Sequence, residues 1–380
     1  MKTEQKKWQR GQGWENGSTW KLGATAQLVL AFGSGDALSE AGLLEELRGK
    51  FGRAQIVGCS TAGEIYDTAV LEQSLAVTAI EFESTRLRMV DAQISAAEES
   101  AEVGRKLGKE LRADDLAHVL VLSDGLNVNG SELVKGLQSA LPAGVAITGG
   151  LSGDGAAFKK TMIVSAGQTR ERSVVAVGFY GESLRVGYGS MGGWDTFGPE
   201  RVITKSKGNV LHDLDGESAL ALYKRYLGPH AAELPASALR FPLCVRAGKD
   251  DAYVVRTILG IDEKEQTMTF AGDVPEGWQA RLMRANFDRL IDGAMGAARA
   301  SQAGLHEVQA ELAILISCVG RRLVLQQRTE EEVEGVRNVL GEGPAITGFY
   351  SYGEIAPFSQ GVKCELHNQT MTITVFSEAA

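Results

Sequence analysis

Three segments of this chain repeat one order of elements, and this repetition is the strongest constraint on the fold. Each segment runs through an apolar strand-like stretch, a loop, an amphipathic helix, a second short apolar stretch and a glycine-rich turn that ends in an acid. The segments span Leu28–Ile65, Val119–Gly155 and Leu312–Ile355. The offset from the first residue of the strand to the first glycine of the turn is 30, 30 and 36 residues (28 to 58, 119 to 149 and 312 to 348). The copies predict repeated supersecondary units rather than a solenoid, whose periods would be shorter and regular.

Strands alternate with helices outside these units, but hairpin patterns occur too. The stretches VVAVGFY and SLRVGYGS, joined by Gly181-Glu182, predict a hairpin, and residues 192–209 read as a loop. We therefore expect an α+β (mixed α/β) fold with two related regions built from the repeated strand–loop–helix–strand–glycine-turn units. The composition of the sequence changes near the prolines of residues 229–242, which suggests a domain boundary close to them. The expected parts are a polar, flexible or lightly docked N-terminal extension (1–26), a first domain (27–220) and a second domain (221–380).

The bulk composition excludes several classes of function. The net charge is −9 and the isoelectric point is about 5.3, so the chain lacks the basic field needed to bind nucleic acid or anionic membrane. No apolar run approaches the roughly 18 residues of a membrane span, and the polar start carries no secretory signal. A cytoplasmic protein is expected. The cysteines form no CxxC pair, which argues against a zinc site or disulfide framework: Cys59, Cys244, Cys318 and Cys364.

The glycine-rich turns GCSTAGEI, GGLSGD and GFYSYGEI have the chemistry of a binding site. Glycines let the backbone approach a ligand, and successive N–H groups in such turns can bind an anion. The turn acids suit an ammonium group, so the pattern predicts a site for a zwitterion such as an amino acid. The alternative is that the glycines and acids serve folding alone. The candidate residues are Cys59, Ser60, Thr61, Gly63, Glu64, Ser152, Asp154, Ser351, Tyr352, Gly353 and Glu354.

Two arginines follow the strand of the third segment, in the sequence CVGRR. If the three units pack alike, the loops after their first strands lie at the carboxyl ends of strands, where α/β proteins commonly bind ligands. Arg321 is therefore a candidate for holding a ligand carboxylate through two hydrogen bonds. A surface salt bridge is the alternative for the same side chain.

Several separated motifs, in order, resemble the FIST family. They are IVGCSTAGEI, ITGGLSGDG, GDVPEGWQARLMRAN, CVGRRLVL, GFYSYGEIAP and HNQTMTITVFS, and the resemblance runs from about Gln27 to the end. It implies paired FIST N and FIST C regions in a sensory protein that binds a small ligand, with amino acids as the usual suggestion. It also implies output through a separate partner, such as a histidine kinase or a diguanylate cyclase or phosphodiesterase. Part of the family binds haem and senses nitric oxide.

Three alternatives to a small-metabolite sensor stay open. A haem sensor would need an axial ligand, and His212 and His230 are the freest of the five histidines because they lie in expected loops. An enzyme would use Cys59 or the pair Glu64 and Glu354, although no histidine next to Cys59 in sequence is available to activate it. A scaffold would bind no metabolite at all. We expect a sensor that is not an enzyme.

Overall fold

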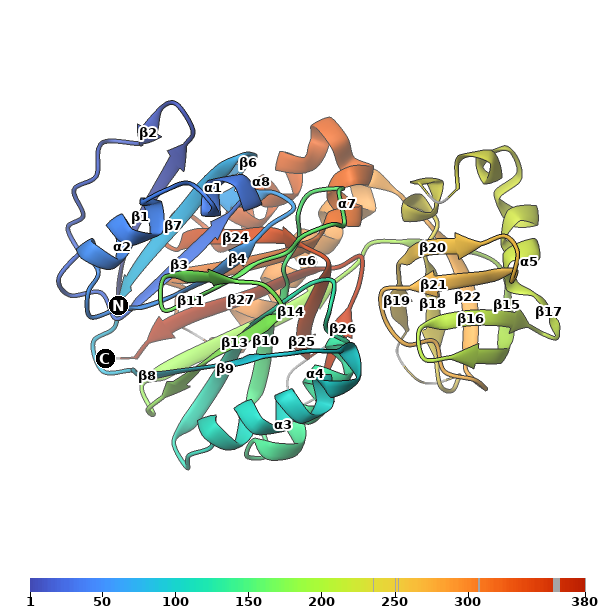
Figure 1. Cartoon of the computed structure of the whole chain (residues 1–380), viewed down its shortest axis with the longest axis horizontal. Coiled ribbons are helices and arrows are strands. Elements are labelled where there is room, and N and C mark those ends of the chain that lie inside the picture. Colours follow the sequence, from blue (N-terminus) through green and yellow to red (C-terminus); the bar gives the residue numbers. More distant parts are fainter. Residues whose placement is uncertain (235, 250, 252, 307, 358–362, 380) are drawn as a thin grey trace.

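The computed structural model describes residues 1–380 except 235, 250, 252, 307, 358–362 and 380. The main body holds three mixed sheets with helices on their outer sides, and a smaller domain stands to one side of it (Figure 1). The combination of helices with mixed sheets confirms the α+β prediction. No helix in the described part of the chain combines the length and apolar character needed to cross a bilayer.

Each repeat unit forms the centre of one sheet. The two apolar runs of a unit pair in parallel, and a later strand joins the first of them in antiparallel fashion. The three sets are β3 (Leu28–Gly33), β4 (Gln55–Ser60) and β7 (Ser74–Glu81) in sheet 1; β9 (Leu116–Ser123), β10 (Ala146–Leu151) and β13 (Ser173–Tyr180) in sheet 2; and β23 (Leu312–Cys318), β24 (Ala345–Ser351) and β27 (Met371–Glu378) in sheet 3.

The strand after each glycine-rich turn crosses to the sheet of another unit. After the first turn, β5 (Glu64–Tyr66) pairs with β24 of sheet 3. After the second, β11 (Ile163–Ser165) pairs with β4 of sheet 1. After the third, β25 (Gly353–Pro357) pairs with β10 of sheet 2. The three units therefore exchange strands in a closed cycle, which ties the sheets into one body.

The remaining strands extend the sheets outward. Sheet 1 has the order β12-β11-β4-β3-β7-β1-β2, sheet 2 the order β26-β25-β10-β9-β13-β8, and sheet 3 the order β14-β27-β23-β24-β5-β6. The strands not yet given bounds are β1 (Lys2–Gln9), β2 (Gly13–Trp14), β6 (Ala69–Leu71), β8 (Arg86–Gln93), β12 (Gln168–Arg170), β14 (Leu184–Met191) and β26 (Cys364–His367).

A single apolar cluster joins the inner faces of the three sheets. In β3, Leu28, Leu30 and Phe32 face this cluster, while Val29 and Ala31 belong to the cluster under the sheet 1 helices. Successive side chains of a strand point to opposite faces, and both faces are covered here, so the strand reads as a continuous apolar run. The rings of Phe32 and Phe349 lie 4.8 Å apart, where sheet 1 meets sheet 3.

Helices cover the outer face of each sheet. Their apolar stripes pack on the strands, as Leu43, Leu44 and Leu47 do in sheet 1. The helices are α1 (Gly35–Leu38) and α2 (Leu43–Lys50) over sheet 1, α3 (Ser100–Leu111, after the short η1, Ala97–Glu99) and α4 (Gly130–Ala140) over sheet 2, and α6 (Phe287–Gly304), α7 (Val319–Leu325), η4 (Gln326–Arg328) and α8 (Thr329–Leu340) beside sheet 3.

The first glycine of each predicted turn lies inside the second strand of its unit, so the turn begins later than expected. A Cβ at Gly58 would stand 1.8 Å from the Ala31 carbonyl oxygen of the parallel strand. Gly149 and Gly348 have the same relation, at the same distance, to the carbonyls of Val121 and Leu315. These glycines are required because any side chain would collide with the neighbouring backbone.

The predicted hairpin across Gly181-Glu182 is wrong. β13 pairs with β8 and β9 in sheet 2, whereas β14 pairs with β27 in sheet 3. Gly181 is where the chain leaves one sheet for the next, with a φ of +120°. A short turn between two alternating runs looks the same in the sequence whether the strands pair or separate.

The small domain has its own sheet and its own core. The stretch expected as a loop, residues 192–209, instead contains a strand of 13 residues, β15 (Asp195–Lys207). The limit expected at 220/221 falls within α5 (Ala219–Leu227), inside this domain. Its other elements are β16 (Val210–Leu214), β17 (Glu217–Ser218), η2 (Gly228–Glu233), η3 (Ala236–Arg240), β18 (Leu243–Arg246), β19 (Val254–Arg256), β20 (Ile258–Asp262), β21 (Thr267–Phe270) and β22 (Gln279–Arg284).

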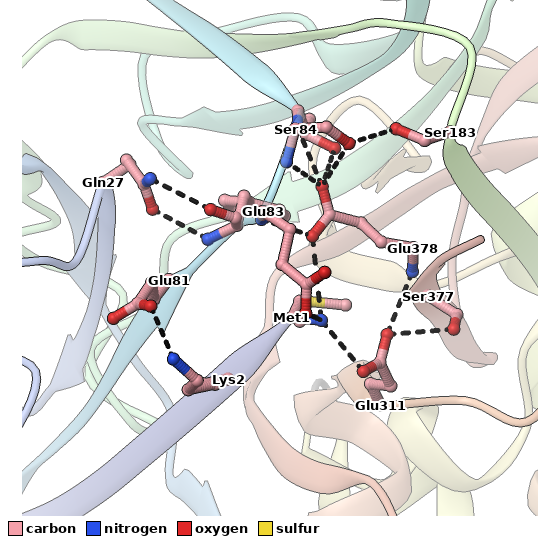
Figure 2. Close-up of polar contacts among 12 residues, drawn as sticks. Met1, Lys2, Gln27, Glu81, Glu83, Ser84, Ser183, Glu311, Ser377 and Glu378 are labelled. Atoms are coloured by element: carbon pink, nitrogen blue, oxygen red, sulfur yellow. Dashed lines mark hydrogen bonds and ion pairs between the residues drawn. The ribbon is translucent and has the colours of Figure 1, made fainter. Parts of the chain in front are cut away.

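The start of the chain is docked, contrary to the expectation of a flexible or lightly docked extension. β1 pairs with β7 along its whole length, from Lys2 opposite Glu81 to Gln9 opposite Ser74. Figure 2 shows the beginning of β1 beside the end of β27, where the Met1 amino group lies 3.0 Å from a carboxylate oxygen of Glu311. Polar composition was misleading here because β1 lies near the edge of its sheet, where one face meets solvent.

Candidate functional site

A pocket of about 1180 Å³ opens where the three repeat units meet. We call it the first pocket. Its wall comes from the loop after β3 (residues 34–39), the first turn (61–64), the segment after the second turn (154–162) and the region of α7 to the start of α8 (319–330). Side chains near residues 70–73 complete it. The loop after the first strand of the first unit and the segment after the first strand of the third unit thus meet at one pocket, whereas the corresponding loop of the second unit does not line it.

Glu64 is the buried acid of this pocket. Thr61 and Ser74 donate hydroxyl hydrogen bonds to its two carboxyl oxygens, at 2.5 and 2.6 Å. Burial is the main influence on its pKa, which rises from 4.5 to about 7, although both hydroxyls and Arg322 oppose that rise. The carboxyl group can therefore gain or lose a proton near neutral pH.

Arg322 is one of the two cations of the first pocket, the other being Lys160. It comes from α7, donates hydrogen bonds to the Ala62 carbonyl and the Glu72 carboxylate, and lies over the ring of Tyr350 at 5.7 Å. Gly63 has a φ of +132°, a backbone conformation that other residues rarely adopt, so the turn needs glycine at this position. The first turn and α7 thus hold the guanidinium against the backbone of the first unit.

Asp154 brings the second turn to the same pocket. Burial alone would raise its pKa, but the Tyr352 hydroxyl and the N–H groups of residues 158, 159 and 160 donate to its oxygens and hold the pKa below its ordinary value. The Tyr352 ring stacks on Phe158 at 4.4 Å. The second and third turns are joined through this contact.

Glu354 is the counterpart of Glu64 in the third turn, but it does not line the first pocket. Ser351 and Thr370 donate hydroxyl hydrogen bonds to it at 2.6 and 2.9 Å. Burial raises its pKa from 4.5 to about 8. Glu64 and Glu354 therefore do not form a pair of acids in one pocket.

The structure corrects the expectation for Arg321. This side chain is completely buried, and its Nε and Nη2 donate to one oxygen of Glu332 at 3.1 and 2.8 Å. It also donates to the carbonyls of Gly192 and Leu290. The residues expected to be loop form α7, and the helix turns Arg321 inward and Arg322 towards the pocket.

Four other candidates lie in the packed interior and do not line the first pocket: Cys59, Ser60, Ser152 and Gly353. Cys59 sits in the central apolar cluster, and burial raises the pKa of its thiol well above 9.0. Such a thiol is a poor nucleophile because the thiolate is the reactive form. Ser60 uses its hydroxyl to accept a hydrogen bond from the Met162 N–H at 2.9 Å.

The histidines do not fit a haem site in either pocket, since none of them lines the first pocket or the second one described below. His212 lies in β16 and His230 in η2, both in the small domain, away from the glycine-rich turns. Burial lowers the pKa of His118 to about 3 and that of His367 to about 4. No ligand role is therefore assigned to them.

Sequence reasoning missed most of the charged lining of the first pocket. Five acids and two cations line it: Asp36, Glu64, Glu72, Asp154, Glu330, Lys160 and Arg322. Only Glu64 and Asp154 were predicted, because they belong to the repeated turns. Asp36 was within reach of the same reasoning, since it lies in the loop after the first strand of the first unit.

Residues 27–217 match the FIST N domain and residues 219–357 match the FIST C domain. No curated protein matches the chain. A crystal structure of "cyanuic acid hydrolase from A. caulinodans" is 9% identical, with a TM-score of 0.36 over 94% of this chain and 91% of that one. That likeness is too low to carry an argument.

Proposed function

Because the chain belongs to the FIST family, we propose that it is a cytoplasmic sensor whose first pocket binds an amino acid or a similar ammonium-bearing metabolite. FIST domains are associated with sensory functions in signal transduction. Binding then changes how the protein acts on a separate partner. A histidine kinase, a diguanylate cyclase or a phosphodiesterase is the kind of partner that the family resemblance implies.

The observation that carries the proposal is that Glu64 and the Arg322 guanidinium line the same pocket. An amino acid carries both charges, so it needs a cation for its carboxylate and an acid for its ammonium group. Arginine suits a carboxylate because its planar fork offers two parallel N–H donors. The excess of acids over cations in the lining favours a ligand with at least one ammonium group.

The signal would arise because all three repeat units contribute to the pocket. A ligand that contacts the first turn, Asp154 and α7 together favours the arrangement in which these parts are closest. A partner that recognises that arrangement reads the shift in population. The closed exchange of strands among the sheets limits the motion to loops and helices around the pocket.

The haem and Cys59 alternatives receive no support from a specific contact. No histidine lines either pocket described here, and the Cys59 thiol is packed among apolar side chains. The amino acid proposal is tested by titrating each of the twenty amino acids into the protein by calorimetry. A bound amino acid also raises the melting temperature by mass action, with about 2.7 kcal/mol gained at 100 times its Kd.

The decisive comparison uses three variants. Glu64→Gln and Arg322→Met should each weaken the best amino acid at least about tenfold, which corresponds to 1.4 kcal/mol. Glu354→Gln is the matched control, because Glu354 has the same hydroxyl partner three residues before it but lies outside the pocket. Unchanged affinity in both pocket variants, or no binding by any amino acid, would overturn the proposal.

The affinity should also depend on pH. Glu64 has a pKa of about 7 without ligand, and an ammonium group favours its charged form, so binding releases a proton. Affinity should therefore fall as the pH drops below about 7 and level off above it. Glu64→Gln should lack this dependence.

A further inference from the structure

A second pocket, of about 840 Å³, lies between sheet 2 and the small domain. One wall is formed by α4 and the loop that follows it, and another by the segment around Leu366 of β26. The small domain contributes Arg256 and Trp278. This second pocket shares no lining residue with the first pocket.

Arg256 is a buried cation that forms no ion pair among the described residues, although the more distant carboxylates of Glu365 and Asp273 partly offset the lowering of its pKa by burial. Its side chain is only 6% exposed, and its Nε donates to the Asp273 carbonyl oxygen at 2.8 Å. Its Nη1 donates to the carbonyls of Leu366 and Val255, at 3.1 and 3.3 Å. Within the described residues no carboxylate lies within ion-pair distance of this guanidinium, and its Nη2 has no hydrogen-bond acceptor. A buried charge is costly unless it is paired, so an anion placed directly against this guanidinium would be favoured.

We propose that the second pocket binds a small organic anion, with a carboxylate on Arg256 and a flat apolar body against Trp278. The pocket volume falls within the usual range for small-molecule sites, roughly 300–1,000 Å³. The walls around Trp278 are largely apolar, with Val134, Leu141, Pro142 and Pro275. A few polar groups in a largely apolar pocket are the usual arrangement for such ligands.

The charges of the lining limit the ligand to one negative charge. Three cations, Lys135, Arg256 and Lys363, face two acids, Asp273 and Glu365, so the excess is a single positive charge. Lys135 forms ion pairs with Glu132 at 2.6 Å and with Asp273 at 3.9 Å, so the cations left for a ligand are Arg256 and Lys363, beside the single acid Glu365. A monoanionic carboxylate fits this balance, while a doubly charged phosphate would be repelled by the acids.

Two further details fit a ligand at Arg256. The Ser131 hydroxyl, at the start of α4, is buried and has no hydrogen-bond partner among the described residues, and Ser131 lines the pocket. A Cβ at Gly272 would stand 3.0 Å from Arg256 Nε, so glycine leaves room for the guanidinium. The buried hydroxyl offers the ligand a second polar contact, as a buried polar group needs one.

A ligand here would join the small domain to the three-sheet body. Arg256 already makes such a link, since it belongs to β19 of the small domain and donates to Leu366 of β26 in sheet 2. An anion held by Arg256 and packed against α4 adds to that link. The second pocket is thus a place where a metabolite can fix the position of the small domain independently of the first pocket.

The test uses 2-naphthoate and the neutral 2-naphthamide as matched probes, titrated into the full chain by calorimetry. The acid should bind at least about tenfold more tightly than the amide. Arg256→Gln should remove that preference. Arg281→Gln, in strand β22 of the same sheet and outside the pocket, should keep it.

Arg256→Lys guards against loss of folding, because it keeps the charge but lacks the fork of donors. It should still prefer the acid, with weaker binding than the original protein. Equal affinity for acid and amide, absence of binding by both, or an unchanged preference in Arg256→Gln would each overturn the proposal. If Arg256→Gln does not fold, Arg256→Lys provides the test instead. In that case, binding of the acid by Arg256→Lys as tightly as by the original protein would overturn the proposal.

Discussion

Glu64 and Glu354 occupy equivalent positions after two of the three glycine-rich turns, and each accepts a hydrogen bond from the hydroxyl three residues before it. The Thr61 to Glu64 distance is 2.5 Å and the Ser351 to Glu354 distance is 2.6 Å. Only Glu64 lines a described pocket. The two turns therefore give their acids the same local hydrogen bond. How the units pack determines which of the two acids lines a pocket.

The first prediction concerns Glu354→Gln. The fold raises the pKa of Glu354 from 4.5 to about 8, so the protonated form stabilises the fold and this contribution is lost as the pH rises through about 8. The original protein should lose up to about 1.4 kcal/mol of unfolding free energy per pH unit between these values. Glutamine cannot ionise, so the variant should gain stability relative to the original protein from pH 5 to pH 8.

Urea unfolding at several pH values measures this difference. Glu64→Gln provides the comparison, because the pKa of Glu64 rises only to about 7. The stability that this variant gains relative to the original protein should therefore stop increasing near pH 7. A constant difference between Glu354→Gln and the original protein at every pH would contradict the prediction.

The second prediction concerns the glycine of β4. In Gly58→Ala the new Cβ would stand 1.8 Å from the Ala31 carbonyl oxygen, so the parallel pair has to separate. We expect a loss of about 3 kcal/mol or more in urea unfolding. Gly49→Ala in α2 is the control, since its Cβ would meet nothing within 4 Å, and it should stabilise the helix by up to about 1 kcal/mol. Equal stability of the two variants would show that the close strand contact is unimportant.

The sequence predicted the three units well because each is local. The apolar runs, the amphipathic helices and the glycine-rich turns lie within about forty residues, a length over which periodicity and turn residues decide the structure. The strand exchange is different in kind. Nothing near Glu64 indicates that β5 pairs with β24, almost three hundred positions later in the chain, because such pairing depends on how whole units pack.

The site was predicted only where it coincides with a repeat. The turn acids Glu64 and Asp154 were found, but Arg321 was chosen in place of its neighbour Arg322. The two arginines lie on one short helix, and successive residues of a helix point about 100° apart. A loop was expected at these positions, and a loop does not predict which of the two arginines points towards the pocket. Arg256 carries no local signal, since its isolation is a property of the assembled pocket.

The third prediction concerns the acid at the end of β27. The N–H groups of Glu83 and Ser84 donate to Glu378 (Figure 2), as do the N–H and hydroxyl groups of Thr85. Burial opposes their effect on the pKa of Glu378, but together these donors lower it to about 2. This contribution to stability is present above pH 4.5 and is lost as the pH falls through about 2. Glu378→Gln should therefore be less stable by about 1–3 kcal/mol at pH 7.

The difference should shrink as the pH approaches 2, measured by urea unfolding. Glu83→Gln is the control, because Glu83 is 71% exposed and lies 3.5 Å from the Met1 amino group, which also lies 3.7 Å from Glu378. An exposed ion pair contributes little, so this variant should match the original protein. An equal loss in both variants would show that the Met1 amino group, and not the backbone N–H groups, makes Glu378 important.

The last prediction separates the two arginines of α7. Arg321→Met leaves Glu332 buried without its cation and should cost about 3–5 kcal/mol of unfolding free energy. Arg322→Met removes a partly exposed side chain, and should cost less than about 1 kcal/mol while weakening the ligand of the first pocket.

The double variant Arg321→Met with Glu332→Leu tests the cause. Removing both charges relieves the unpaired carboxylate, so the double variant should be more stable than the sum of the single losses predicts, by about 0.5–3 kcal/mol. Full recovery is not expected, because Ser317 and Tyr350 also donate to Glu332 and would lose their acceptor. Additive losses in urea unfolding would mean that Arg321 acts through the carbonyls of Gly192 and Leu290 alone.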